Sequence, residues 1–166
     1  KGVLTGLTEI SEIVSSKMVD GVSVPCEGEL YYRGINVIDL VNGFTNDNRF
    51  GFEETTYLLL FGKLPNKTEL ADFEKILSGY RNLPKNFVRD VIMKKPSDDL
   101  MNNLARAILN LYAYDSNAND LSIPNVLRQS LELIALFPML AVYSYRAKSY
   151  YIDKGSFFIH HPLQIP

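Results

Sequence analysis

The chain has 166 residues, 46% of them hydrophobic and 22% charged, with a formal net charge of −2. This is the length of one domain that buries a core, and so weak a charge excludes a bulk electrostatic attraction to nucleic acid or an anionic membrane. The single Cys26 rules out an internal disulfide and favours a reducing, cytoplasmic setting. Because the chain begins at Lys1 rather than Met, we expect residues upstream of it.

Residues 1–33 are predicted to form a two-stranded β ribbon. β-Branched residues alternate loosely with Thr and Glu over 3–14, and residues 28–32 offer a second extended run. Arg33 and Gly34 are expected to close the ribbon.

Residues 36–95 are predicted to form short helices. Asn36 is a suitable N-cap for the first of them. Asn66 and Glu69, three residues apart, match a capping box at the start of another. A further short amphipathic helix is expected between Pro84 and about Lys94. The side chains predicted to face inward are Leu70, Phe73, Ile76 and Leu77 in the capped helix, and Phe87, Val88, Val91 and Ile92 in the last one.

Residues 97–150 are predicted to hold two longer helices, over 98–114 and 125–148. Ser97 is expected to start the first of them, with Asp98 and Asp99 in its first turn. Apolar side chains cover well over half of this helix. Pro138 is expected to kink the second helix.

Within the second long helix, residues 131–142 are apolar except at Glu132 and Pro138. A helix that is apolar on every side is a buried helix. The stretch is also shorter than the roughly 20 residues that span a bilayer. We therefore predict that protein surrounds it, supplied by the rest of this chain or by a second copy of it.

The last segment, 151–166, is expected to be an irregular tail anchored by residues 157–159. It contains the only histidines of the chain, His160 and His161. Neighbours in sequence tend to point apart, and no third ligand lies at a fixed spacing from them. We interpret the pair as ordinary loop residues rather than metal ligands.

The other reactive side chains also have structural interpretations. Cys26 lies at a turn, with no base that the sequence places near it. Glu53-Glu54 and Asp98-Asp99 fall in predicted first helical turns, where they compensate the helix dipole. A small basic face is suited to phosphates, although a solvated helix surface explains it as well; its members are Lys85, Arg89, Lys94 and Lys95. The residues alone therefore indicate a mainly helical domain and assign no catalytic, cofactor-binding or metal-binding residue.

Two segments together resemble citrate synthase. They are Glu-Leu-Tyr-Tyr-Arg-Gly-Ile-Asn-Val-Ile-Asp-Leu at 29–40 and Gly-Phe-Glu-Glu-Thr-Thr-Tyr-Leu-Leu-Leu-Phe-Gly-Lys-Leu-Pro at 51–65. The likeness continues through both long helices to Ile-His-His-Pro at 159–162. It covers nearly all of this chain but well under half of that enzyme, as its N-terminal portion.

The resemblance implies a citrate-synthase-like multi-helical fold, mainly α with a short N-terminal β ribbon. It also implies a homodimer in which helices 98–114 and 125–148 pack against those of a second copy. The implied parent enzyme is a cytoplasmic transferase of the tricarboxylic acid cycle that condenses acetyl-CoA with oxaloacetate to citrate and CoA, without a further cofactor. We expect the chain to self-associate through Leu104, Ile108, Leu111, Leu131, Ile134 and Leu140.

The resemblance places the catalytic residues of the family outside this chain. One catalytic histidine of the family lies in a His-Gly block, and no His of this sequence is followed by Gly. Arg33, in the Tyr-Arg-Gly match, is interpreted as structural. We therefore expect residues 1–166 to be an inactive N-terminal fragment of a bacterial-type enzyme. Two alternatives stay open: a fragment of 2-methylcitrate synthase, which uses propionyl-CoA, and a freestanding helical interaction module.

Overall fold

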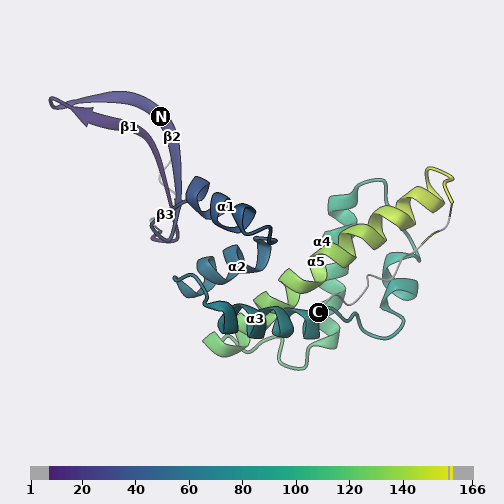
Figure 1. The fold of residues 1–166 in the computed structure, drawn as a ribbon. Coiled ribbons are helices and arrows are strands. Elements are labelled where there is room, and N and C mark those ends of the chain that lie inside the picture. Colours follow the sequence, from purple (N-terminus) through teal and green to yellow (C-terminus); the bar gives the residue numbers. More distant parts are fainter. Residues whose placement is uncertain (1–7, 157, 159–166) are drawn as a thin grey trace. The chain divides into compact units, whose positions relative to one another are not determined.

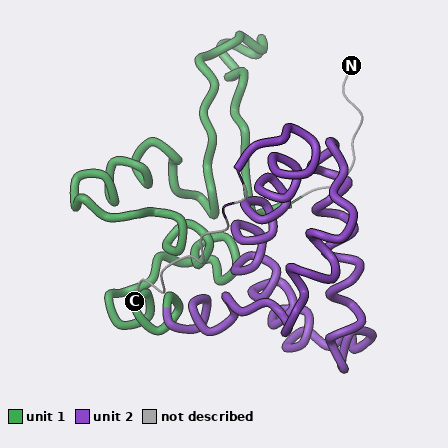
Figure 2. Tube along the Cα trace, turned by 90° about the vertical axis from the view of Figure 1, so that its right-hand side faces the viewer, with its two compact units in different colours: residues 1–74 green, residues 75–166 purple. Residues whose placement is uncertain are grey.

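The structure, a computed structural model, describes residues 8–156 and 158. The chain divides into two compact units, unit 1 over residues 1–74 and unit 2 over residues 75–166 (Figures 1 and 2). Unit 1 contains a small sheet and helices, and the described elements of unit 2 are all helical. The predicted fold class, mainly α with an N-terminal β ribbon, is confirmed.

The sheet of unit 1 is built on a long β hairpin. Strands β1 (Ser11–Val19) and β2 (Val22–Tyr32) pair antiparallel, and the short strand β3 (Ile35–Asn36) joins the end of β2. The turn residues Asp20 and Gly21 have φ values of 50° and 80°. A two-residue turn of type I′ requires positive φ at both central positions, which Asp-Gly tolerates well.

The position of this turn corrects the predicted strand boundaries. The ribbon was expected to pair residues 3–14 with 28–32, with the turn region left as a connection. Instead both strands run up to the Asp-Gly turn at 20–21, because that dipeptide lets the chain reverse within two residues. Residues 3–7 lie outside the described part of the chain.

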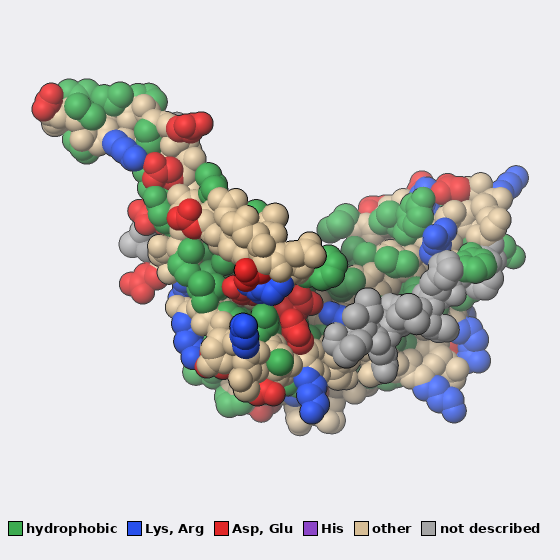
Figure 3. Space-filling view, in the orientation of Figure 1, with side chains coloured by type: hydrophobic (Ala, Val, Ile, Leu, Met, Phe, Trp, Pro, Cys, Tyr) green, Lys and Arg blue, Asp and Glu red, His purple; other side chains and the backbone are tan. Residues whose placement is uncertain are grey.

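The hairpin carries exposed hydrophobic side chains, which Figure 3 shows along much of its visible surface. They include Ile13, Met18 and Val22. Across the two strands, Lys17 Nζ donates to Glu29 Oε1 at 2.8 Å. Because Glu29 also accepts from Tyr31, hydrogen bonds and the ion pair lower the pKa of its carboxyl. The hairpin is therefore held by its backbone ladder and a polar cluster rather than by a covered apolar face.

Helix α1 (Val37–Asn46) begins where the sequence predicts. The Asn36 side chain accepts a hydrogen bond from the Ile38 amide at 2.8 Å, as an N-cap does. Helix α2 (Phe52–Phe61) ends at Gly62, which adopts a left-handed conformation with φ 77°. Just before α2, a Cβ added to Gly51 would lie 2.2 Å from the Phe44 ring. The absence of a side chain at residue 51 is therefore what allows this ring to pack there.

Helix α3 (Lys67–Tyr80) confirms the predicted capping box. The Asn66 amide donates to Glu69 Oε2, and the Glu69 amide donates to Asn66 Oδ1, both at 2.9 Å. Phe73 is buried as predicted and meets Tyr57 edge to face, with ring centroids 5.4 Å apart. Ile76 is exposed, which corrects the predicted inward stripe.

Unit 2 has a continuous hydrophobic core. Its helical elements are η1 (Val88–Ile92), α4 (Leu100–Leu111), η2 (Tyr112–Tyr114) and α5 (Ile123–Tyr151). The short helix expected before Pro96 is reduced to the single turn η1, which still buries Phe87 and Ile92 as predicted. The buried cluster consists of Phe87, Ile92, Ala107, Leu136, Leu140, Tyr143 and Ala147.

Helix α4 starts later than predicted. Asp99, not Ser97, is its N-cap, and its side chain accepts from the Asn102 amide at 3.1 Å. Ser97 is held instead by the buried Asn103, which accepts from its amide at 2.9 Å and donates to its carbonyl at 2.7 Å. Asp98 and Asp99 therefore precede the helix instead of forming its first turn.

Helix α5 runs unbroken through Pro138, so the expected kink stays a prediction. Phe137 is 41% exposed and Val142 50% exposed, so one copy of the chain does not cover the whole stretch, and cover by a second copy stays a prediction. Helices α4 and η1 pack against α5, and Leu136, Leu140 and Tyr143 of α5 lie in the core that these elements form. By length and composition α5 is apolar enough to cross a membrane, a property that core helices of globular proteins share.

The set of residues predicted to mediate self-association needs a correction. Leu131 and Leu140 are buried within the chain itself, and Leu104, Ile108 and Leu111 pack against the core of unit 2. These side chains are used inside one copy. Ile134 is half-buried. The exposed large apolar residues of the two helices are Met101 and Leu109 on α4 and Ile123, Val126, Phe137, Val142, Tyr145, Tyr150 and Tyr151 on α5.

Candidate functional site

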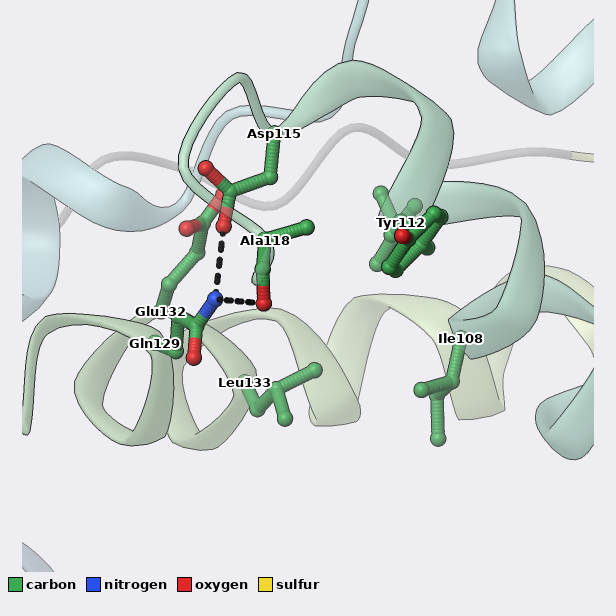
Figure 4. A pocket seen from close by; sticks show the side chains of 8 residues that line it. Ile108, Tyr112, Asp115, Ala118, Gln129, Glu132 and Leu133 are labelled. Atoms are coloured by element: carbon green, nitrogen blue, oxygen red, sulfur yellow. Dashed lines mark hydrogen bonds between the residues drawn. The ribbon is translucent and has the colours of Figure 1, made fainter. Parts of the chain in front are cut away.

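A pocket of about 260 Å³ lies between α4 and α5 in the described part of unit 2 (Figure 4). Three segments form its walls: the end of α4 with η2, the loop 115–122, and the first half of α5. In Figure 4, Asp115, Gln129 and Glu132 gather at one end, and Tyr112 and Ile108 lie at the other. The lining residues are Ile108, Leu111, Tyr112, Asp115, Ala118, Gln129, Glu132 and Leu133.

The loop 115–122 owes its shape to short polar side chains that bind the nearby backbone. Asp115 Oδ1 accepts from the Asn117 amide at 3.0 Å, and Asp120 Oδ1 accepts from the Ser122 amide at 2.9 Å. From α5, Asn125 Nδ2 donates to the carbonyls of Asn117 and Asp120, at 2.9 and 2.7 Å. The loop is therefore fixed to the start of α5 by side-chain hydrogen bonds.

Asp115 is the best-connected carboxylate of the pocket. Its Oδ2 accepts from Gln129 Nε2 at 2.9 Å and from Arg128 Nη2 at 2.6 Å. These two hydrogen bonds, together with the one from the Asn117 amide, lower the pKa of Asp115 to about 2. The carboxyl is therefore ionised throughout the neutral range.

Arg128 joins Asp115 to the second carboxylate of the pocket. Its Nη1 donates to Glu132 Oε2 at 3.0 Å, one helical turn along α5, and its Nε donates to Asn125 Oδ1 at 2.9 Å. Two carboxylates thus share one guanidinium, which leaves a local charge of −1. That excess negative charge faces a pocket whose other wall is apolar.

This chemistry is suited to recognition rather than proton transfer. A general base works best when its pKa lies near the working pH, and the pKa of Asp115 lies far below it. Among the described residues, no group of three His, Cys, Asp or Glu side chains is placed to hold a metal ion.

The acidic pairs singled out in the sequence have local roles. Glu53 and Glu54 lie in the first turn of α2 as predicted, and Glu54 also accepts from Arg49 Nη1 at 2.7 Å. Asp99 caps α4. The structure brings neither pair to the pocket.

Arg33 is structural, as predicted. Its Nε and Nη2 both donate to the Leu59 carbonyl, at 3.2 and 2.9 Å, and so tie the end of the hairpin to α2. Arg33 itself has a positive φ of 49° at this corner. The Arg-Gly pair closes the β2–β3 turn, so this part of the ribbon prediction is confirmed.

The remaining candidates form no site in the described structure. Cys26 is half-buried and lies within β2 rather than at the predicted turn, because the hairpin reverses at 20–21. Arg89 of the predicted basic face pairs with its neighbour Asp90 at 2.7 Å, and Lys85, Lys94 and Lys95 are exposed. His160 and His161 lie outside the described residues.

Sequence reasoning missed the pocket. The segment 115–120 is rich in Asn and Asp, a composition that predicts a turn and no further role for its acids. What the sequence does not show is that Asp115 meets Arg128 and Gln129, thirteen and fourteen residues away. The one feature of the sequence that points to the pocket is the density of polar side chains on both sides of Pro124.

Comparison with known proteins gives a consistent result along the whole chain. The family model described as "Citrate synthase, C-terminal domain" matches residues 1–163. A 2-methylcitrate synthase of Shewanella oneidensis is 32% identical over 147 residues, which cover 86% of this chain and 36% of that protein. A citrate synthase of Saccharolobus solfataricus is 30% identical over 140 residues, which cover 84% of this chain and 34% of that protein.

The solved structures agree with these relatives. The crystal structure of citrate synthase from Pyrobaculum aerophilum superposes with a TM-score of 0.72 at 26% identity, covering 98% of this chain and 37% of that one. The chain thus spans about a third of the length of the relatives it matches. The matching family model is described as a C-terminal domain, so the predicted N-terminal placement is not confirmed by it.

Proposed function

Because the chain belongs to the citrate synthase family, we propose that it forms the N-terminal helical scaffold of an enzyme that condenses acetyl-CoA with oxaloacetate to citrate and CoA. The observation that carries this proposal is the family match over residues 1–163. It is supported by the fold shared with the Pyrobaculum aerophilum enzyme over 98% of this chain. The scaffold would act in the cytoplasm, in keeping with the single cysteine.

On this proposal, catalysis needs residues other than 1–166. The acid that the described structure perturbs most, Asp115, has a lowered pKa and bound oxygens, which suit neither general acid nor general base catalysis. No histidine of the sequence stands in a His-Gly pair. Residues 1–166 alone should therefore release no CoA from acetyl-CoA and oxaloacetate above a control without protein.

One relative supports propionyl-CoA as a second candidate substrate of the whole enzyme. The Shewanella oneidensis protein, at 32% identity, is named 2-methylcitrate synthase. The two activities share a fold, and they are separated by supplying acetyl-CoA or propionyl-CoA with oxaloacetate.

The test begins with reading the source gene on both sides of the codons for residues 1–166 and expressing its whole product. Faster CoA release with acetyl-CoA supports the proposal, and faster release with propionyl-CoA supports the second substrate. No release with either one contradicts both. A gene that encodes only these residues would also contradict the synthase proposal and would point to the helical interaction module.

The proposed scaffold self-associates through the exposed sides of α4 and α5. Leu109 on α4 is 74% exposed, and Phe137 and Val142 on α5 are about half exposed. Such apolar surface on adjacent helices is typical of an interface between copies.

Light scattering should therefore give a mass twice 18.8 kDa. Leu109→Glu should return it to the monomer value, because a carboxylate would be buried without a partner. Ile13→Glu is the matched control, since Ile13 is equally exposed but lies on the hairpin. A monomer at high concentration, or equal effects of both variants, would contradict the proposed interface.

A further inference from the structure

The pocket between α4 and α5 has two chemically different ends. Ile108, Leu111 and Leu133 supply hydrocarbon, and Asp115 and Glu132 supply carboxylates. The guanidinium of Arg128 compensates only one of these two charges. A ligand that fits both ends carries a positive charge at one end of a short apolar body.

The hydrogen-bonding capacity of the lining points in the same direction. Gln129 Nε2 donates to Asp115 Oδ2 at 2.9 Å and to the Ala118 carbonyl at 3.3 Å, which uses both of its hydrogens. The Tyr112 hydroxyl donates to Asn119 Oδ1 at 3.0 Å. The hydrogen-bond donors of Gln129 and Tyr112 are therefore already used within the chain and are not available to a ligand.

By contrast, two side-chain oxygens of the pocket lining can still accept a hydrogen bond from a ligand. Arg128 contacts Glu132 through Oε2, and Glu132 Oε1 accepts no hydrogen bond among the described residues. Gln129 Oε1 accepts none there either. A pocket with free acceptors, spent donors and an excess negative charge selects a donor-rich cation and disfavours carboxylates and phosphates.

We propose that this pocket binds a small organic amine, a primary ammonium group on a hydrocarbon chain of a few carbons. The ammonium lies at Glu132 Oε1, and the chain lies along Ile108 and Leu133 past the ring of Tyr112. The cavity of about 260 Å³ is large enough for such a ligand. This site is independent of the proposed synthase activity.

The test is a calorimetric titration of the whole chain with pentylammonium chloride. We expect saturable binding in the millimolar range that weakens as NaCl is raised, because a partly exposed ion pair is screened. Pentanol lacks the charge, pentanoate reverses it, and methylammonium lacks the hydrocarbon; each should bind at least about tenfold more weakly. Equal binding of pentanol or pentanoate would overturn the proposal.

Two variants locate the site. Glu132→Gln keeps the shape of the side chain and its hydrogen bond from Arg128 but removes the charge, and should weaken pentylammonium binding about tenfold. Glu74→Gln removes an exposed carboxylate of α3, far along the chain, and should change binding less than twofold. Circular dichroism of both variants checks that they fold. Equal effects on binding would show that the amine is attracted by the overall charge and would overturn the site.

A lysine side chain of another protein presents the same ammonium group. Nα-acetyl-lysine amide carries this group on a peptide backbone and distinguishes the two sources. Weaker binding than pentylammonium supports a free amine. Tighter binding would overturn that assignment in favour of a polypeptide ligand.

Discussion

Replacing Leu136 by alanine tests the core of unit 2. Its side chain is fully buried on α5, within the cluster that contains Phe87, Leu140 and Tyr143. Truncating such a leucine removes its transfer free energy and leaves a cavity, which together cost roughly 2.7–5.0 kcal/mol. Because large side chains of different elements surround the site, we expect partial collapse and a loss of about 3 kcal/mol.

Leu109→Ala is the matched control on α4. Leu109 is 74% exposed, so about a quarter of its side chain is hidden. Fully burying a leucine contributes roughly 1.5–3 kcal/mol, so truncation here should cost about 0.4–0.8 kcal/mol. The better helix propensity of alanine offsets a few tenths of that.

Urea denaturation followed by far-ultraviolet circular dichroism gives both values as free energies of unfolding. The reasoning is refuted if Leu136→Ala costs less than about 1 kcal/mol, or if both variants cost the same at every protein concentration. A cost for Leu109→Ala that grows with protein concentration would instead support the proposed interface, since a dimer is stabilised by mass action.

Three further outcomes are expected. Gly51→Ala should destabilise unit 1 by about 1–3 kcal/mol, since its Cβ would overlap the Phe44 ring, whereas Gly28→Ala, which meets nothing within 4 Å, should cost far less in the same thermal melt. Because folding lowers the pKa of Asp115 from 3.8 to about 2, its stabilisation is complete above about pH 4 and is lost as the pH falls toward 2; Asp115→Asn should lack this acid step in melts recorded between pH 5 and 2, and an unchanged step would contradict the network. Ser144→Ala should leave the melting temperature unchanged or raise it, because the buried Ser144 hydroxyl has no hydrogen-bond partner in the described structure.

The sequence by itself determined the features that depend on neighbours along the chain. The Asn36 cap and the Asn66-Glu69 capping box form as predicted because each closes hydrogen bonds within three residues. The left-handed end of α2 at Gly62 has the same local origin. The family resemblance carried by residues 29–40 and 51–65 also needed no coordinates.

The predicted strand boundaries of the hairpin were wrong, although the sequence contains the local signal that gives the right ones. Asp20-Gly21 is a strong hairpin signal, and it places the turn where the structure has it. The strands were instead assigned from loose alternation of residue types, which is a weaker signal than turn chemistry.

Tertiary structure decided which face of each long helix is buried. The apolar stretch 131–142 looks alike on every side in sequence, yet Leu136 and Leu140 are enclosed while Phe137 and Val142 are exposed. That difference is set by where α4 and η1 dock, and composition carries no information about it when both faces are apolar.

Tertiary structure also created the pocket. Asp115 becomes a carboxylate with a pKa of about 2 only because the chain turns back through 115–122 and brings Gln129 and Arg128 to it. Hydrogen bonds between residues thirteen or fourteen positions apart depend on the path of the chain, whereas a cap depends on the residues beside it. For this reason the sequence determined the local caps and the family, and only the folded chain determined the site.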